Sequence, residues 1–116
     1  MTRVRAEAMA WLFVRLSGVA LLFLVLGHML LMHVLVGVNA IDFAFVSARW
    51  TGAGWRTYDL AMLLLAMPHA ALGLRGMAAE HLPRSVRSPL LGTGYLVCAV
   101  LTGLGTWVIF TFQRPI

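Results

Sequence analysis

Three apolar stretches, each long enough to cross a lipid bilayer, dominate this chain of 116 residues. They run from about residue 11 to 38, from 55 to 79 and from 89 to 113, and a membrane-spanning helix needs about 20 apolar residues. Only 11% of the residues are charged, whereas an ordinary soluble domain has about 25%. The sequence therefore predicts one all-α membrane domain over 1–116, with transmembrane helices at about 11–38, 55–80 and 89–113.

The basic residues predict how these helices are oriented. All nine are arginines. Six lie at the start of the first stretch or around the connection between the second and third (Arg3, Arg5, Arg15, Arg75, Arg84 and Arg87), and three lie at the opposite ends (Arg49, Arg56 and Arg114). The positive-inside rule then places the N-terminus in the cytoplasm and the C-terminus outside. We interpret the excess of basic residues as a sign of membrane topology and contact with lipid headgroups. Nucleic-acid binding is not expected, because no soluble basic surface is predicted.

The two connections differ in character. Residues 39–54 are the longer one, and Asp42 to Arg49 within it are expected to form a short helix on the membrane surface. Residues 80–89 are the shorter one, and Pro89 is expected to open the third helix. Small residues form two stripes along that helix, which predict close packing of helices: Gly92, Ala99, Gly103 and Thr106, and Gly94, Cys98, Thr102 and Gly105.

Two histidines, His28 and His69, lie deep inside the first and second apolar stretches. An ionisable side chain at that depth is costly, and it is by default a functional-site hypothesis. Neutral imidazole is also a common ligand of haem iron. His33 approaches the outer interface, where we interpret it as a wetted side chain.

The surroundings of His69 favour a flat ligand. Gly73, Gly76 and Glu80 fall within about 20° of His69 on one helix face. The two glycines leave a wall without side chains, against which a porphyrin plane can lie. Pro68 permits a kink just before the histidine. A hydrogen-bonded packing histidine remains the alternative reading of the same pattern.

Polar residues gather at the predicted cytoplasmic end of the first two helices. They are Trp11, Arg15, Ser17, Arg75, Glu80 and His81. A quinone head group needs hydrogen-bond donors at its carbonyls and a source of protons, and these side chains supply both. A helix end at the membrane surface also collects polar residues for no other reason, so position alone leaves both readings open.

The order and spacing of these residues resemble one known family over about residues 10–81. The matching segments are Ala10-Trp-Leu-Phe-Val-Arg-Leu-Ser-Gly18, Leu26-Gly-His28, Ile41-Asp-Phe, Ala48-Arg-Trp50, Asp59-Leu and His69-Ala-Ala-Leu-Gly-Leu-Arg75. Together they resemble the hydrophobic membrane anchor of succinate dehydrogenase, the D-type subunit of succinate:quinone oxidoreductase.

The resemblance implies a place in a larger complex. A second three-helix anchor would complete the bundle, and an iron–sulfur subunit and a flavoprotein subunit would dock at the cytoplasmic face of a bacterial inner membrane. Electrons from succinate would reach a quinone there, which joins the tricarboxylic acid cycle to electron transport in respiratory complex II. One cysteine, Cys98, cannot hold an iron–sulfur cluster, so flavin and cluster chemistry belong to other chains and no catalytic residue is expected here. Whether the complex forms a trimer of heterotetramers stays open.

The resemblance also assigns the site residues. His69 is implied as an axial ligand of haem b, and His28 as the ligand of a second haem in the two-haem branch, with Gly73 and Gly76 as the haem wall. The quinone-site candidates are Trp11, Arg15, Ser17, Glu80 and His81. Relatives commonly have Asp-Tyr where this chain has Glu80-His81, although a histidine can donate the same hydrogen bond. A fumarate reductase anchor and a haem-free structural three-helix protein remain the alternatives.

Overall fold

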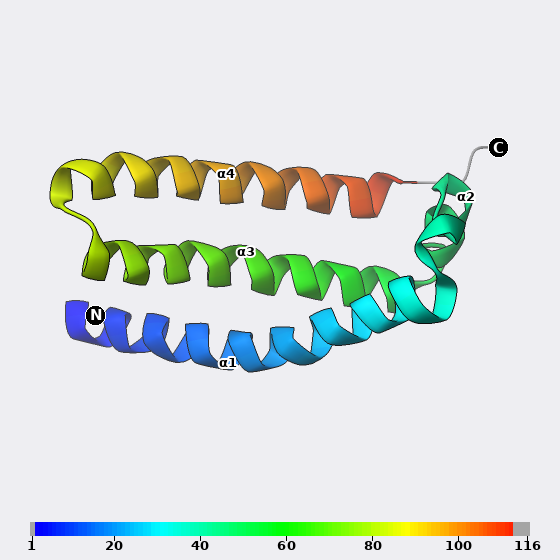
Figure 1. The fold of residues 1–116 in the computed structure, drawn as a ribbon, viewed down its shortest axis with the longest axis horizontal. Coiled ribbons are helices and arrows are strands. Elements are labelled where there is room, and N and C mark those ends of the chain that lie inside the picture. The colour runs from blue at the N-terminus through cyan, green and yellow to red at the C-terminus, as the bar shows by residue number, and fades with distance from the viewer. Residues whose placement is uncertain (1, 113–116) are drawn as a thin grey trace.

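The computed structural model describes residues 2–112, and it forms a bundle of three long helices with a short helix across one end. The long helices are α1 (Arg3–Met29), α3 (Ala53–His81) and α4 (Arg84–Thr111), and the short one is α2 (Phe43–Arg49). α3 lies between α1 and α4, and α2 lies beyond the ends of all three (Figure 1). The described part of the chain contains no strand. All three long helices are apolar and long enough to cross a membrane, which confirms the predicted all-α fold.

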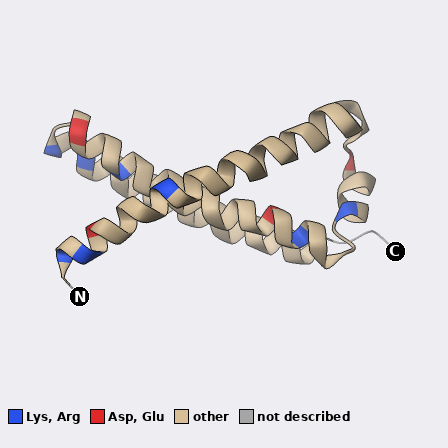
Figure 2. Ribbon diagram, turned by 90° about the horizontal axis from the view of Figure 1, so that it is seen from below, with Lys and Arg blue, Asp and Glu red and all other residues tan. Residues whose placement is uncertain are grey.

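α1 starts about two turns earlier than the sequence predicted. It begins at Arg3 because the hydroxyl of Thr2 caps it, accepting the backbone N–H of Arg5 at 3.4 Å. A π-helical segment, Leu30–Val36, extends it to a total of 34 residues. Gly37 then ends the helix with a φ of 89°, a backbone conformation that residues with a Cβ rarely adopt. In Figure 2, α1 crosses the other two long helices at an angle.

The connection between α3 and α4 is much shorter than the predicted 80–89. Only Leu82 and Pro83 separate the two helices. Pro83 is the N-cap of α4, and its carbonyl accepts the N–H groups of Val86 and Arg87. The side chain of Arg87 donates to the carbonyls of Leu82 and Ala79, at 2.9 and 3.4 Å, which helps to satisfy the free carbonyls at the end of α3. The expectation that Pro89 opens this helix is therefore wrong, because Pro83 does so and Pro89 lies inside α4.

The two small-residue stripes of α4 have different surroundings. A Cβ added at Gly94 would lie 2.6 Å from a methyl of Leu74, and one at Gly105 would lie 2.8 Å from Leu63. This stripe therefore allows the close contact between α4 and α3. Around Gly92 and Gly103 no atom lies within 4 Å of such a Cβ, so the other stripe remains open on the outside of the bundle.

α2 is fixed across the end of the bundle by polar contacts. Asp42 caps it by accepting the N–H of Phe45 at 2.8 Å, so the predicted short helix is confirmed. Arg49, only 8% exposed, donates to both carboxylate oxygens of Asp59 on α3, at 2.9 and 3.2 Å. The indole N–H of Trp50 donates to the same carboxylate at 2.7 Å. α2 and α3 therefore share a partly buried ion pair.

Very few side chains are buried inside this bundle. Among the described residues the buried hydrophobic ones are Leu21, Met32, Ala78 and Ile109. Large apolar side chains are exposed along the outside of the long helices, among them Leu22, Phe23, Leu96, Val100 and Trp107. An apolar surface of this extent is stable only against lipid or another apolar surface, as expected for a membrane protein.

Candidate functional site

His69 lies near the middle of α3 and faces α1. Its ring nitrogen Nδ1 lies 2.9 Å from the hydroxyl oxygen of Ser17. Ser17 is almost fully buried, with 3% of its surface exposed, and its hydroxyl can donate to the carbonyl of Val14 at 3.2 Å. The next residue, Gly18, also packs against this ring, because a Cβ added there would lie 3.3 Å from its Cε1 atom. α1 therefore contacts the imidazole along its Nδ1–Cε1 edge.

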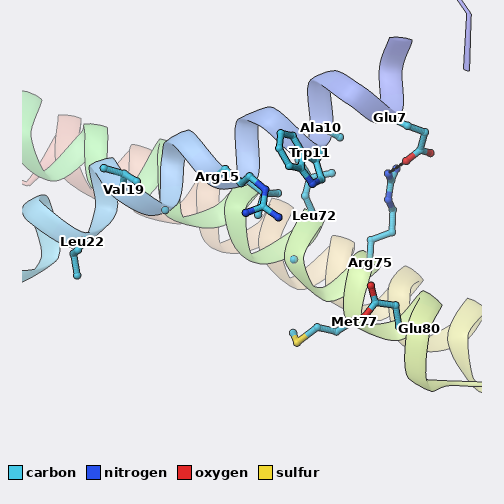
Figure 3. A pocket seen from close by; sticks show the side chains of 14 residues that line it. Glu7, Ala10, Trp11, Arg15, Val19, Leu22, Leu72, Arg75, Met77 and Glu80 are labelled. Atoms are coloured by element: carbon cyan, nitrogen blue, oxygen red, sulfur yellow. Dashed lines mark hydrogen bonds and ion pairs between the residues drawn. The ribbon is translucent and has the colours of Figure 1, made fainter. Parts of the chain in front are cut away.

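An open cavity of about 820 Å³ lies between α1 and α3, toward the N-terminal end of α1 (Figure 3). Its polar side chains come from both helices: Glu7, Trp11, Arg15, Arg75 and Glu80. The guanidinium of Arg15 lies 4.2 Å from the centre of the Trp11 ring, a distance that suits a cation–π contact. Arg75 donates to the carboxylate of Glu7 at 2.6 Å.

The cavity gathers three of the five predicted quinone-site residues and omits two. Trp11, Arg15 and Glu80 line it. Ser17 does not, because its hydroxyl is turned toward His69. His81 does not line it either: its side chain is exposed and lies 3.9 Å from Glu80. No signal in the sequence pointed to Glu7, which sits 68 residues from its partner Arg75.

A second cavity, of about 560 Å³, lies between α3 and α4. His69 lines this cavity, together with Gly73 and apolar residues that include Leu74 and Val97. Gly76 lines only the first cavity, whereas Gly73 lines both. A Cβ at either glycine would meet no atom within 4 Å. The space beside both glycines is therefore open, as predicted for a wall without side chains. Only Gly73, however, lines the same cavity as the histidine.

His28 lies near the other end of the bundle, beside the polar cluster that holds α2. Its Nδ1 is 3.8 Å from Asp59, and this buried atom has no hydrogen-bond partner among residues 2–112. Tyr58, the neighbour of Asp59, donates its hydroxyl to the carbonyl of Leu24 at 2.6 Å. Asp59 and His69 are ten residues apart on α3, which is about 15 Å along a helix axis. The two histidines therefore lie at different depths.

The fold and these sites define a multi-pass helical membrane protein with polar side chains placed at two depths between its helices. The succinate dehydrogenase/fumarate reductase transmembrane subunit family has a sequence model that matches residues 1–104. The chain belongs to this family, and so to the membrane part of an oxidoreductase complex with other subunits. No curated protein matches it in a sequence comparison.

The residues around His69 fit a haem iron. A histidine that ligates a metal usually donates its second ring N–H to a fixed acceptor, and the buried hydroxyl of Ser17 stands at hydrogen-bond distance from Nδ1. Nε2 makes no hydrogen bond within the described residues, which leaves it for a ligand. Gly73 beside the ring leaves room for a flat group. No three of the His, Cys, Asp and Glu side chains described gather as a metal site.

Proposed function

We propose that this chain is a D-type anchor subunit of succinate:quinone oxidoreductase in a bacterial cytoplasmic membrane. Its partners are a second anchor subunit, an iron–sulfur subunit and a flavoprotein subunit. The family match supports the complex, and the wide exposed apolar surface of α1 and α4 gives a second membrane subunit an area to pack against.

The observation that carries the proposal is the contact between His69 and Ser17 inside the bundle. In this contact, Nδ1 of His69 lies at hydrogen-bond distance from the buried hydroxyl of Ser17. Gly73, one turn further along α3, leaves open space beside the histidine. Nε2 of His69 would hold the iron of haem b, together with a residue of the second anchor subunit. When bound, haem b provides a one-electron carrier inside the membrane.

His28 suits a second ligand position at the opposite end. The carboxylate of Asp59 lies 3.8 Å from Nδ1, which is close but beyond hydrogen-bond distance. Arg49 and Trp50 hold that carboxylate in place. In a two-haem complex, His28 would hold the second haem, as the resemblance to the two-haem branch implies.

The cavity between α1 and α3 supports the quinone part of the proposal. Its volume of about 820 Å³ lies within the usual range of small-molecule sites, about 300–1,000 Å³. Trp11 gives an aromatic surface, and the guanidinium groups of Arg15 and Arg75 give hydrogen-bond donors for the carbonyls of a quinone. Glu80 lines the same cavity and its side chain is exposed, so its carboxylate can take a proton from water and pass it to a reduced quinone oxygen.

The experiment compares His69→Ala with His33→Ala in the purified complex. We expect a b-type absorption band in the dithionite-reduced minus oxidised spectrum of the wild type. The band should be lost or halved in His69→Ala and kept in His33→Ala, since His33 is exposed on the π-helical segment away from both cavities. The assembly of the four subunits, followed by gel filtration, controls for loss of the complex.

Each alternative has its own outcome. A wild-type complex that contains no haem supports a haem-free structural anchor, and an unchanged band in His69→Ala rejects this histidine as a ligand. Fumarate reduction by a low-potential quinol that outpaces succinate oxidation favours a fumarate reductase anchor. Each of these results contradicts a different part of the proposal.

A further inference from the structure

Two consecutive residues of α1 meet the same edge of the His69 ring. Ser17 is 2.9 Å from Nδ1, and the backbone of Gly18 approaches so closely that a Cβ would lie 3.3 Å from Cε1. The first contact needs a hydroxyl at position 17, and the second leaves little room for a side chain at position 18.

The hydrogen on the serine hydroxyl decides which ring nitrogen is free. A hydroxyl has one hydrogen to donate and lone pairs with which to accept. When Ser17 donates to the carbonyl of Val14, 3.2 Å away, it can only accept from His69, so Nδ1 carries the proton and Nε2 keeps a lone pair. When Ser17 donates to Nδ1 instead, the proton lies on Nε2, and that nitrogen cannot bind a metal.

Ser17 is also badly placed for quinone chemistry. It is buried, and it is absent from the lining of the cavity that contains Trp11, Arg15 and Glu80. Arg15 and Ser17 are two residues apart, so they lie on opposite sides of α1. The Arg-x-Ser-Gly segment therefore serves two sites: its arginine faces the cavity, and its serine and glycine face the histidine.

We propose that Ser17 is a positioning residue for the haem ligand: its hydroxyl accepts the Nδ1–H of His69, fixes the tautomer that leaves Nε2 unprotonated, and holds the ring orientation together with Gly18. This inference rests on the proposed role of His69. It removes Ser17 from the quinone site and assigns it to the haem site, as a support that does not touch the iron.

The test measures haem retention and the haem midpoint potential in the intact complex for Ser17→Ala, Ser17→Thr and Ser47→Ala. Ser47→Ala is a matched control, because Ser47 is also buried and also donates to the carbonyl three residues earlier at 3.2 Å, without touching a histidine. Loss of a residue that hydrogen-bonds to a metal ligand typically weakens metal binding by about 10–100-fold. We expect the affinity for haem, measured as haem retained on dilution, to fall by about this factor in Ser17→Ala.

The midpoint potential separates positioning from simple packing. A hydrogen bond from Nδ1–H makes the imidazole a stronger donor to iron, which favours the oxidised metal. Ser17→Ala should therefore raise the midpoint potential, whereas Ser17→Thr keeps a hydroxyl and should stay near the wild type, as should Ser47→Ala.

The outcomes of this test are distinct from those of the proposed function. If haem depends on His69 but Ser17→Ala keeps the wild-type potential and retention, only the positioning role is overturned. It is overturned as well if Ser17→Thr and Ser17→Ala lose haem equally, because the hydroxyl that Ser17→Thr keeps then has no effect on haem binding. Absence of haem from the wild type, or its retention in His69→Ala, rejects the proposed function itself.

Discussion

Glu7 and Arg75 form an ion pair between α1 and α3 at the rim of the larger cavity (Figure 3). Their side chains are 60% and 39% exposed. An exposed pair of this kind contributes about 0–1 kcal/mol to stability. Its main effect is therefore on position: it holds the Arg75 guanidinium beside the cavity, where Arg15 and Glu80 also lie.

Replacing Glu7 should affect the quinone more than the fold. Glu7→Gln removes the charge that holds Arg75, so we expect the KM for quinone to rise by up to about tenfold, equivalent to about 1.4 kcal/mol. The thermal midpoint of the complex should stay nearly unchanged. Steady-state succinate:quinone reductase assays over a range of quinone concentrations measure this, with Arg5→Gln as the control for loss of an exposed charge on the same helix. An unchanged KM would place the quinone away from this rim.

At the scale of single residues, the sequence predicted which side chains could bind a ligand, but not which of them lie in contact. The depth of His69 and the spacing of Gly73 and Arg75 can be read along one helix. The contact of His69 with Ser17 joins residues 52 positions apart, and that of Arg75 with Glu7 joins residues 68 apart. Such pairs depend on how α1 crosses α3, which helical periodicity does not determine.

The short helix α2 shows the same limit at the scale of elements. The position of this helix in the chain was predicted from local sequence, and the structure shows that Asp42 caps it. Its attachment was not, because Arg49 is held by Asp59 of another helix, and the Arg49 guanidinium also lies 4.2 Å from the centre of the Trp55 ring. The bounds of α4 were missed for a related reason: two prolines, Pro83 and Pro89, could each open a helix, and local rules did not choose between them.

Asp59→Asn should release α2 from the bundle. The substitution leaves the nearly buried Arg49 without its counter-charge, and breaking a buried ion pair from one side costs about 3–5 kcal/mol. We expect a lower denaturant midpoint in detergent and faster tryptic cleavage after Arg49 and Arg56. Asp42→Ala is the control, since loss of a helix cap costs only about 1 kcal/mol. Equal effects of the two substitutions would show that the ion pair adds little.

The whole molecule separates its charges by end. Arg3 and Arg5 begin α1, while Arg75, Arg84 and Arg87 lie at or near the α3–α4 connection at the same end of the bundle (Figure 2). Arg49 and Arg56 lie at the α2 end, and Arg114 lies outside the described residues. The predicted charge difference between the two ends is thus kept in the folded chain, with the candidate quinone cavity at the more basic end.

The distribution of arginines predicts which end of the bundle faces the cytoplasm. Because basic residues stay inside, the α3–α4 connection should be cytoplasmic and the α2 end external. Single cysteines at Ser85→Cys and Thr51→Cys, both exposed positions, are made in a Cys98→Ala background and treated with a membrane-impermeant maleimide on intact spheroplasts. Thr51→Cys should react at once, and Ser85→Cys only after permeabilisation. The opposite labelling pattern would show that the chain has the reverse orientation in the membrane. The cavity of Arg15 and Glu80 would then lie on the side away from the cytoplasmic subunits, and electrons arriving from succinate could not reach a quinone there directly.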